Sequence, residues 1–149
     1  MIKDTPLIEA VDQKNYHIIK KLLKIKSIEV NYNGLYHYLP LYCAIKNNSI
    51  YITKILLNHP DIIVNYPPPA TFCSSLLSLS IECGFEDIFY LLIKHPNIDP
   101  NGKVPMSHHS LSPLYFATIC NYSEIVQTLL SNPTIDINIK DRLFGLIFW

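Results

Sequence analysis

The chain has 149 residues, which is enough for one domain of ordinary size or a short repeat array. Its 12 basic and 12 acidic side chains cancel, so no net charge draws it toward nucleic acid or an anionic membrane. Hydrophobic residues make up 49% and charged residues 16%, which excludes a disordered chain and supplies a core. The apolar runs are far shorter than the ~20 residues of a transmembrane helix.

The N-terminus shows no signal peptide, because acidic residues interrupt it and it has no apolar run. The four cysteines (Cys43, Cys73, Cys83 and Cys120) form no CxxC pair. We therefore expect free thiols in a reducing compartment, the cytoplasm or alternatively the nucleus, and no secretion.

Four blocks of 19 residues align without gaps, and this repeat organises the chain. They begin at residues 5, 39, 75 and 112, so successive starts are 34, 36 and 37 residues apart. An asparagine follows each block at a constant offset of eight residues. Self-similarity at this period predicts stacked structural repeats. The blocks are 5–23, 39–57, 75–93 and 112–130, and the asparagines are Asn31, Asn65, Asn101 and Asn138.

The first half of each block predicts a short helix. Thr5, Ser75 and Ser112 can serve as N-caps, because their hydroxyl oxygens can accept from the free amides of the first turn. A proline often follows at the first helical position, where it costs no hydrogen bond. A small residue five positions after each start lets a neighbouring helix approach closely. The prolines are Pro6, Pro40 and Pro113, and the small residues are Ala10, Ala44, Ser80 and Ala117.

The second half of each block predicts another short helix, with apolar residues at helical spacing and a polar or flexible break before it. His59-Pro60, His95-Pro96 and Asn132-Pro133 end these helices, because proline disfavours helix in the preceding residue. The following segments (61–65, 97–101 and 134–138) suggest extended entries into protruding loops. Helices this short are marginal alone in water, so we expect them to stack into a solenoid.

The pattern TPL-x-x-A, a turn, I/V-x-x-LL and then D-x-N resembles the ankyrin repeat family from Thr5 to Asn138. The family's histidine after TPL is absent, the turn glycine remains only as Gly84, and Leu76 replaces one proline. The resemblance implies an all-α ankyrin-repeat solenoid with short extended or β-turn fingers, a single domain over 1–149. Its repeats would span about 5–38, 39–74, 75–111 and 112–138, followed by a tail at 139–149.

The tail is rich in apolar side chains from Leu143 to Trp149. It could fold over the last repeat as a cap, or it could begin an incomplete fifth repeat of a longer array. We expect a monomer unless this tail self-associates.

The resemblance implies that a partner protein binds finger tips and the concave surface of the first helices. The fingers at 32–38, 66–74 and 102–111 are rich in Tyr, Phe, His, Pro and Met, which suits binding hot spots, although the same side chains could pack between fingers. The first-helix set could equally be a solvated face. The finger candidates are Tyr36, Tyr38, Phe72, Ser74, His109 and Leu111, and the first-helix candidates are Asp12, Gln13, Lys46, Asn47, Glu82, Cys83, Ile119 and Cys120.

Catalytic and metal-binding signals are weak. His108 and His109 lack neighbouring Cys, Asp or Glu at zinc-ligand spacing, so a loop or packing role is the better interpretation. Cys83 or Cys120 with a finger histidine could form a thiol enzyme, but no specific base accompanies them. We expect a non-catalytic protein-protein interaction module without cofactor or metal, and no nucleic-acid or membrane partner. The alternative is a structural spacer within a longer ankyrin-repeat scaffold.

Overall fold

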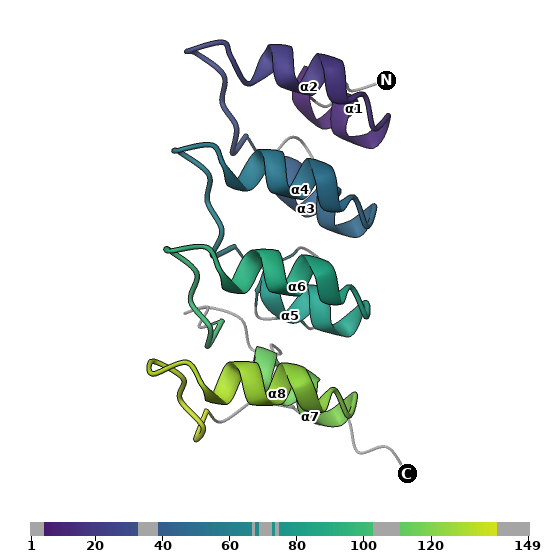
Figure 1. Cartoon of the computed structure of the whole chain (residues 1–149). Helices are drawn as coiled ribbons and strands as arrows, with labels where there is room; N and C mark the ends of the chain where they lie inside the picture. Colours follow the sequence, from purple (N-terminus) through teal and green to yellow (C-terminus); the bar gives the residue numbers. More distant parts are fainter. Residues whose placement is uncertain are drawn as a thin grey trace.

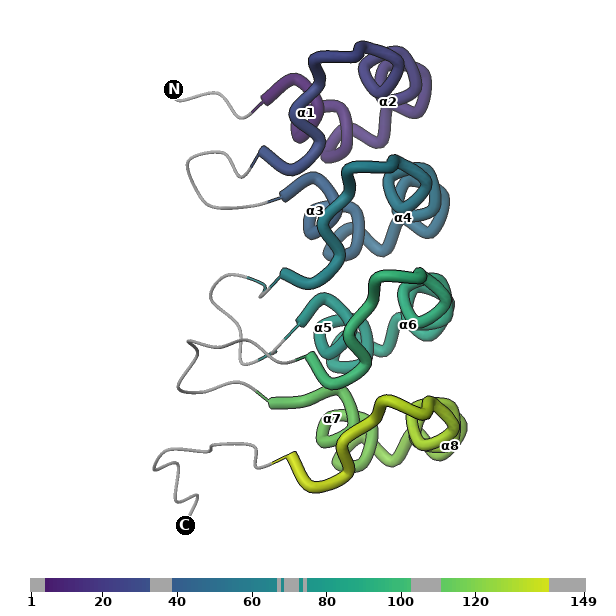
Figure 2. Tube along the Cα trace, turned by 90° about the vertical axis from the view of Figure 1, so that its left-hand side faces the viewer, coloured from purple at the N-terminus to yellow at the C-terminus, as the bar shows by residue number. Residues whose placement is uncertain are grey.

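The computed structural model describes residues 5–32, 39–66, 68, 73, 75–102 and 111–139. These residues form four helix pairs stacked along one axis (Figure 1). In the turned view, the first helices make one layer and the second helices another (Figure 2). No helix in these ranges has the length and apolar character needed to cross a bilayer. The helices are α1 (Pro6–Asp12), α2 (Tyr16–Leu22), α3 (Pro40–Lys46), α4 (Ile50–Leu57), α5 (Leu76–Glu82), α6 (Glu86–Ile93), α7 (Pro113–Ile119) and α8 (Ser123–Leu130).

The first helices begin where the sequence predicts. The hydroxyl oxygens of Thr5, Ser75 and Ser112 accept hydrogen bonds from backbone amides three residues later. Prolines occupy the first turn of α1, α3 and α7. Local capping therefore sets the register of three of the four first helices.

Each helix pair is joined by a turn in which one residue has a left-handed backbone. The φ angles are 52° at Lys14, 47° at Asn48, 70° at Gly84 and 58° at Asn121. This conformation ends an α-helix and reverses the chain, and glycine adopts it at least cost. The turn geometry is thus common to all four repeats even though only the third has glycine there.

The core runs between the two helical layers. Ala10, Ala44, Ser80 and Ala117 are all buried, which confirms the role of the small residue in each first helix. The largest fully buried side chain is Phe89 in α6. Leucines and isoleucines from neighbouring repeats complete one continuous hydrophobic cluster. Burial between repeats compensates for helices too short to be stable alone.

The asparagine after each of the first three blocks links one repeat to the next. Asn65 donates through Nδ2 to the backbone oxygen of Asn97 at 2.7 Å, and its Oδ1 accepts from the backbone N–H of Asp99 at 2.8 Å. Asn101 bonds in the same way to Thr134 and Asp136, at 2.9 and 2.7 Å. Asn31 makes the corresponding pair of contacts to the loop at 61–63. A ladder of amide side chains therefore runs along the stack.

The turns after the second helices have a structural cap. The Nδ1 atoms of His59 and His95 each accept a backbone N–H from two residues later at 3.3 Å. The Oδ1 of Asn132 has the same role at 3.0 Å. The segments that follow contain no regular strand within the described ranges. One parallel bridge joins Cys73 to Leu111, near the ends of the finger segments 66–74 and 102–111.

Candidate functional site

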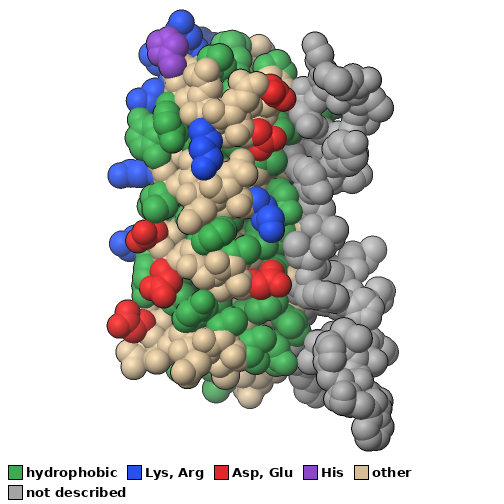
Figure 3. Space-filling view, turned by 90° about the vertical axis from the view of Figure 1, so that its right-hand side faces the viewer, with side chains coloured by type: hydrophobic (Ala, Val, Ile, Leu, Met, Phe, Trp, Pro, Cys, Tyr) green, Lys and Arg blue, Asp and Glu red, His purple; other side chains and the backbone are tan. Residues whose placement is uncertain are grey.

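The first-helix candidates lie at the carboxyl ends of α1, α3, α5 and α7. We call this set the first-helix row: Asp12, Gln13, Lys46, Asn47, Glu82, Cys83, Ile119 and Cys120. Because each occupies the same place in its repeat, the stack aligns them along one edge. Figure 3 faces this edge and shows acidic and basic side chains dispersed singly among polar and apolar ones.

The charge in the row alternates along the stack. Asp12, Lys46 and Glu82 are exposed at successive helix ends, and Ile119, 56% exposed, occupies the fourth. Such an alternating pattern favours a partner with matching charges over a uniformly charged polymer. Repeat four instead offers an aliphatic contact.

Three hydrogen bonds hold side chains of the row in place, the first from Nε2 of Gln13 to Oε1 of Glu9 at 2.5 Å. Asn47 donates through Nδ2 to Oδ1 of Asp12 at 3.1 Å, which joins the first two repeats. The thiol of Cys73 donates to Oε2 of Glu82 at 3.0 Å, which ties the finger segment to α5. These contacts reduce the conformational entropy that a partner would have to remove on binding.

The Cys83 thiol of the row is not activated for nucleophilic chemistry. Burial raises the pKa of the Cys83 thiol; the Lys46 ammonium lowers this pKa and the Glu82 carboxylate raises it further, with a net increase. A raised pKa leaves less thiolate at neutral pH, the opposite of what a catalytic cysteine needs. None of the four cysteines forms a disulfide. Within the described ranges, no three His, Cys, Asp or Glu side chains cluster to hold a metal ion.

Of the six finger candidates, the structure describes only Leu111. Tyr36, Tyr38, Phe72, Ser74 and His109 lie outside the described residues. Leu111 is described and is only 7% exposed, because it pairs with Cys73 and packs into the core cluster. Its backbone oxygen also accepts from the Ser78 hydroxyl at 3.1 Å. Leu111 therefore presents little of its side chain to a partner.

Sequence reasoning missed two features, one within the first-helix row and one away from it. The bond between Cys73 and Glu82 joins residues from different parts of a repeat, and no local pattern marks it. The sequence also gave no indication that hollows lie between consecutive turns after the second helices, on another side of the stack. The signal that could have found them is the recurrence of lysine at Lys20 and Lys54 and again at Lys24 and Lys94.

Comparison with known proteins agrees with the repeat geometry. The family model described as ankyrin repeats (3 copies) matches residues 69–141. An ankyrin repeat domain from Acinetobacter baumannii AYE is similar in structure, with a TM-score of 0.76 and 20% identity over 93% of this chain and 66% of that one. The ankyrin repeat protein EF0377 gives a TM-score of 0.75 and 22% identity over 95% of this chain and 68% of that one. This chain thus spans about two thirds of the length of these neighbours. No curated protein matches it in sequence.

Proposed function

Because the chain is an ankyrin-repeat solenoid, a fold that generally serves protein-protein interaction without catalysis, we propose that it binds a partner protein through the first-helix row and the fingers. The observation that carries the proposal is the alignment of exposed, chemically different side chains at equivalent helix ends. A fold by itself does not fix a partner, so the side chains of this row would supply the selectivity.

The binding surface would have two parts. The row supplies Asp12, Lys46, Glu82 and Ile119 on short helices held by the core. The fingers supply the aromatic candidates Tyr36, Tyr38 and Phe72, together with Ser74 and His109. Aromatic side chains bring a large contact area at low entropic cost, so they would act as anchors beside the selective charges of the row.

Affinity capture with paired variants tests this proposal. The baits are the native chain, a row variant (Lys46→Glu with Ile119→Asp) and a finger variant (Tyr36→Ala, Phe72→Ala and His109→Ala). Glu124→Lys, a charge reversal in α8, is the matched control. Circular dichroism confirms that every bait is folded. A partner that is captured by the native chain and the control but not by one of the two test variants supports the proposal. Calorimetry with the purified partner then measures the same loss of binding. Equal capture by all baits contradicts it.

A second candidate function is a structural spacer in a longer ankyrin scaffold. Leu130 and Ile137 of the fourth repeat are 50% and 65% exposed, whereas Val64, which is equivalent to Ile137 in the second repeat, is 2% exposed. Another repeat stacked there would cover them. If so, this chain self-associates at high concentration, and Leu130→Asp with Ile137→Asp abolishes that association in sedimentation. A native chain that stays monomeric contradicts the spacer role.

A further inference from the structure

Two adjoining hollows lie between the turns that follow the second helices. The first, of about 570 Å³, lies between the end regions of α2 and α4, and the second, of about 420 Å³, between those of α4 and α6. Asn58, His59 and Pro60 line both. The shared wall places the hollows one after the other along the stack, across repeats one to three.

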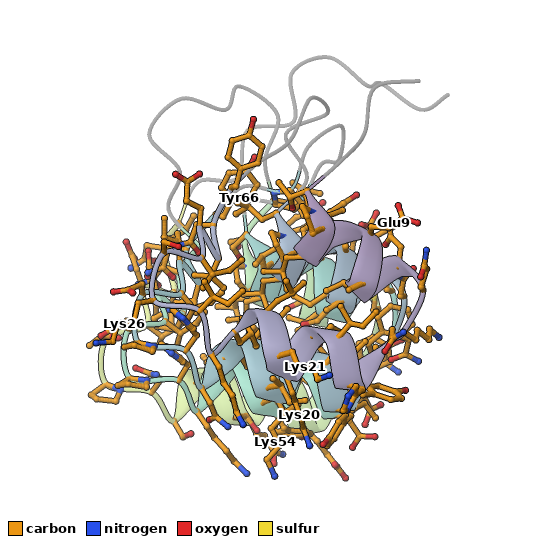
Figure 4. The ribbon with its side chains drawn as sticks, turned by 90° about the horizontal axis from the view of Figure 1, so that it is seen from above. Glu9, Lys20, Lys21, Lys26, Lys54 and Tyr66 are labelled. Carbon is orange, nitrogen blue, oxygen red and sulfur yellow. The ribbon has the colours of Figure 1, made fainter. Side chains whose placement is uncertain are left out.

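Lysines dominate the charge of these hollows. Lys20, Lys24 and Lys26 line the first hollow, and Lys54 and Lys94 line the second. The one acidic lining residue is Asp61. In the view along the stack, Lys20, Lys21 and Lys54 lie on the opposite side of the molecule from Tyr66 (Figure 4). A chain without net charge therefore has a basic surface that is separate from the finger side.

The histidines make the lining richer in hydrogen-bond donors. Because the Nδ1 atoms of His59 and His95 accept backbone N–H groups, the neutral imidazoles carry their proton on Nε2. The lining thus combines ammonium groups with imidazole N–H donors, and prolines at 60 and 96 add no backbone donor or charge. An anion with several acceptor oxygens suits these ammonium and N–H donors. Carboxylates are such anions, and their hydrogen bonds to ammonium groups are charge-assisted.

The lysines of the basic surface lie toward one end of the stack, and the repeats set the distance between them. Two equivalent positions of the block supply four of these lysines: one is lysine in repeats one and two (Lys20 and Lys54), and the other is lysine in repeats one and three (Lys24 and Lys94). In the fourth repeat both positions are neutral, with Gln127 and Ser131. Packed helices lie about 8–10 Å apart, so equivalent side chains recur at about that distance. An extended peptide advances roughly 3.1–3.4 Å per residue, so every third residue advances by about one repeat.

From these observations we propose that the two hollows bind an extended acidic segment of a partner protein, with carboxylates three residues apart and its chain running along the stack. Lys20 and Lys24 of the first repeat pair with one carboxylate, Lys54 of the second with the next, and Lys94 of the third with the last. The imidazoles of His59 and His95 donate to the same groups or to the peptide backbone. This site is separate from the first-helix row, so one partner can engage both or two partners can bind together.

Fluorescence anisotropy with two peptides of equal composition tests the proposal. The spaced peptide is Glu-Ala-Pro repeated three times with an N-terminal fluorescein. The clustered peptide carries its three glutamates together, followed by the same alanines and prolines. We expect the native chain to bind the spaced peptide at least about threefold more tightly at low salt. We also expect affinity to fall as salt rises, because the contacts are ionic.

Charge reversals inside and outside the hollows distinguish binding at this site from a general attraction between the peptide and the charge of the protein. Lys54→Glu is expected to weaken binding of the spaced peptide by about tenfold, and Lys24→Glu by several-fold. Lys14→Glu, the same change of charge on an exposed lysine that lines neither hollow and is not part of the first-helix row, is expected to alter it by less than twofold. Circular dichroism verifies that each variant is folded. The three lysines are exposed, so a folding defect is not expected.

Several outcomes overturn the proposal. Equal weakening by Lys54→Glu and Lys14→Glu means that net charge alone attracts the peptide. Equal affinity for both peptides means that the site does not recognise carboxylates three residues apart. Binding of phosphatidylserine vesicles without binding of either peptide identifies the basic surface as a membrane contact instead. One further outcome distinguishes the two proposals. If the row variant no longer captures its partner but still binds the spaced peptide, the peptide site is independent of the first-helix row.

Discussion

The side-chain oxygen of Asn101 accepts a hydrogen bond at 2.7 Å from the backbone N–H of Asp136, one repeat further along the chain. The Nδ2 of the same asparagine donates to the backbone oxygen of Thr134. One buried amide thus satisfies both a donor and an acceptor of the next loop. This arrangement uses both functions of a primary amide, which explains why asparagine, rather than aspartate, occupies the position.

Replacing Asn101 with alanine should therefore destabilise the fold by about 1–3 kcal/mol, because two partly buried hydrogen bonds between repeats are lost. Chemical denaturation followed by circular dichroism measures this change. Asn138→Ala is the matched control, since its exposed side chain makes no hydrogen bond within the described residues. Equal effects of both substitutions would mean that the ladder contributes nothing specific.

The hydroxyl of Thr53 is buried without a hydrogen-bond partner in the described part of the chain. The equivalent positions in the other repeats hold Ile19, Phe89 and Val126. Thr53→Val keeps the shape and removes the unsatisfied group, so we expect stability to rise by about 1 kcal/mol and Tm by roughly 2–4 °C. Calorimetry measures both.

Thr128→Val is the control for Thr53. The Thr128 hydroxyl already donates to the backbone oxygen of Glu124 at 2.8 Å. Its replacement should change stability by no more than about 0.5 kcal/mol. A destabilised Thr53→Val variant would show that the hydroxyl has a partner in solution.

Substitutions at two turn residues with a left-handed backbone should change the free energy of unfolding in opposite directions. Gly84→Ala should destabilise by about 1–2 kcal/mol, because φ is 70° and the new Cβ would lie 3.2 Å from the Tyr122 hydroxyl oxygen. Lys14→Gly should be neutral or stabilising by up to about 1 kcal/mol, because lysine is strained at φ 52°. Urea midpoints measure both. A strongly destabilised Lys14→Gly variant would indicate that the lysine side chain itself matters.

The raised pKa of Cys83 predicts the pH dependence of its alkylation. Reaction with iodoacetamide, followed by peptide mass spectrometry, should have its midpoint at higher pH for Cys83 than for an unstructured cysteine peptide. A higher pKa in the folded state also means that this thiol favours folding most below the ordinary thiol pKa. That contribution declines as pH rises through the folded-state value. Fast alkylation at neutral pH would contradict the burial of this thiol and reopen the thiol-enzyme alternative.

The helices and their turns were predictable because their determinants are local. Thr5 capping α1, Pro6 following it and Ala10 facing the core all lie within six residues, and the same signals recur in later repeats. The exits at His59 and His95 were also predictable, and their capping role confirms the structural interpretation.

The remaining features depend on contacts between repeats, which periodicity alone does not specify. The constant asparagine offset indicated a loop role but not a bond to residues 30–35 positions away. Leu111 belonged by position to a finger, yet its pairing with Cys73 buries it. The hollows arise from two consecutive turns together, so neither turn reveals them alone. The finger candidates at 36, 38, 72, 74 and 109 stay predictions.

The asparagine ladder also bears on how the chain folds. Each of its bonds closes a loop of one repeat, 30–35 residues, and none requires the two ends of the chain to meet. The entropy of loop closure is therefore similar at every step and does not grow as the structure extends. Folding can begin at any interface between repeats and spread in both directions, with relaxation rates set by the formation of one neighbouring pair.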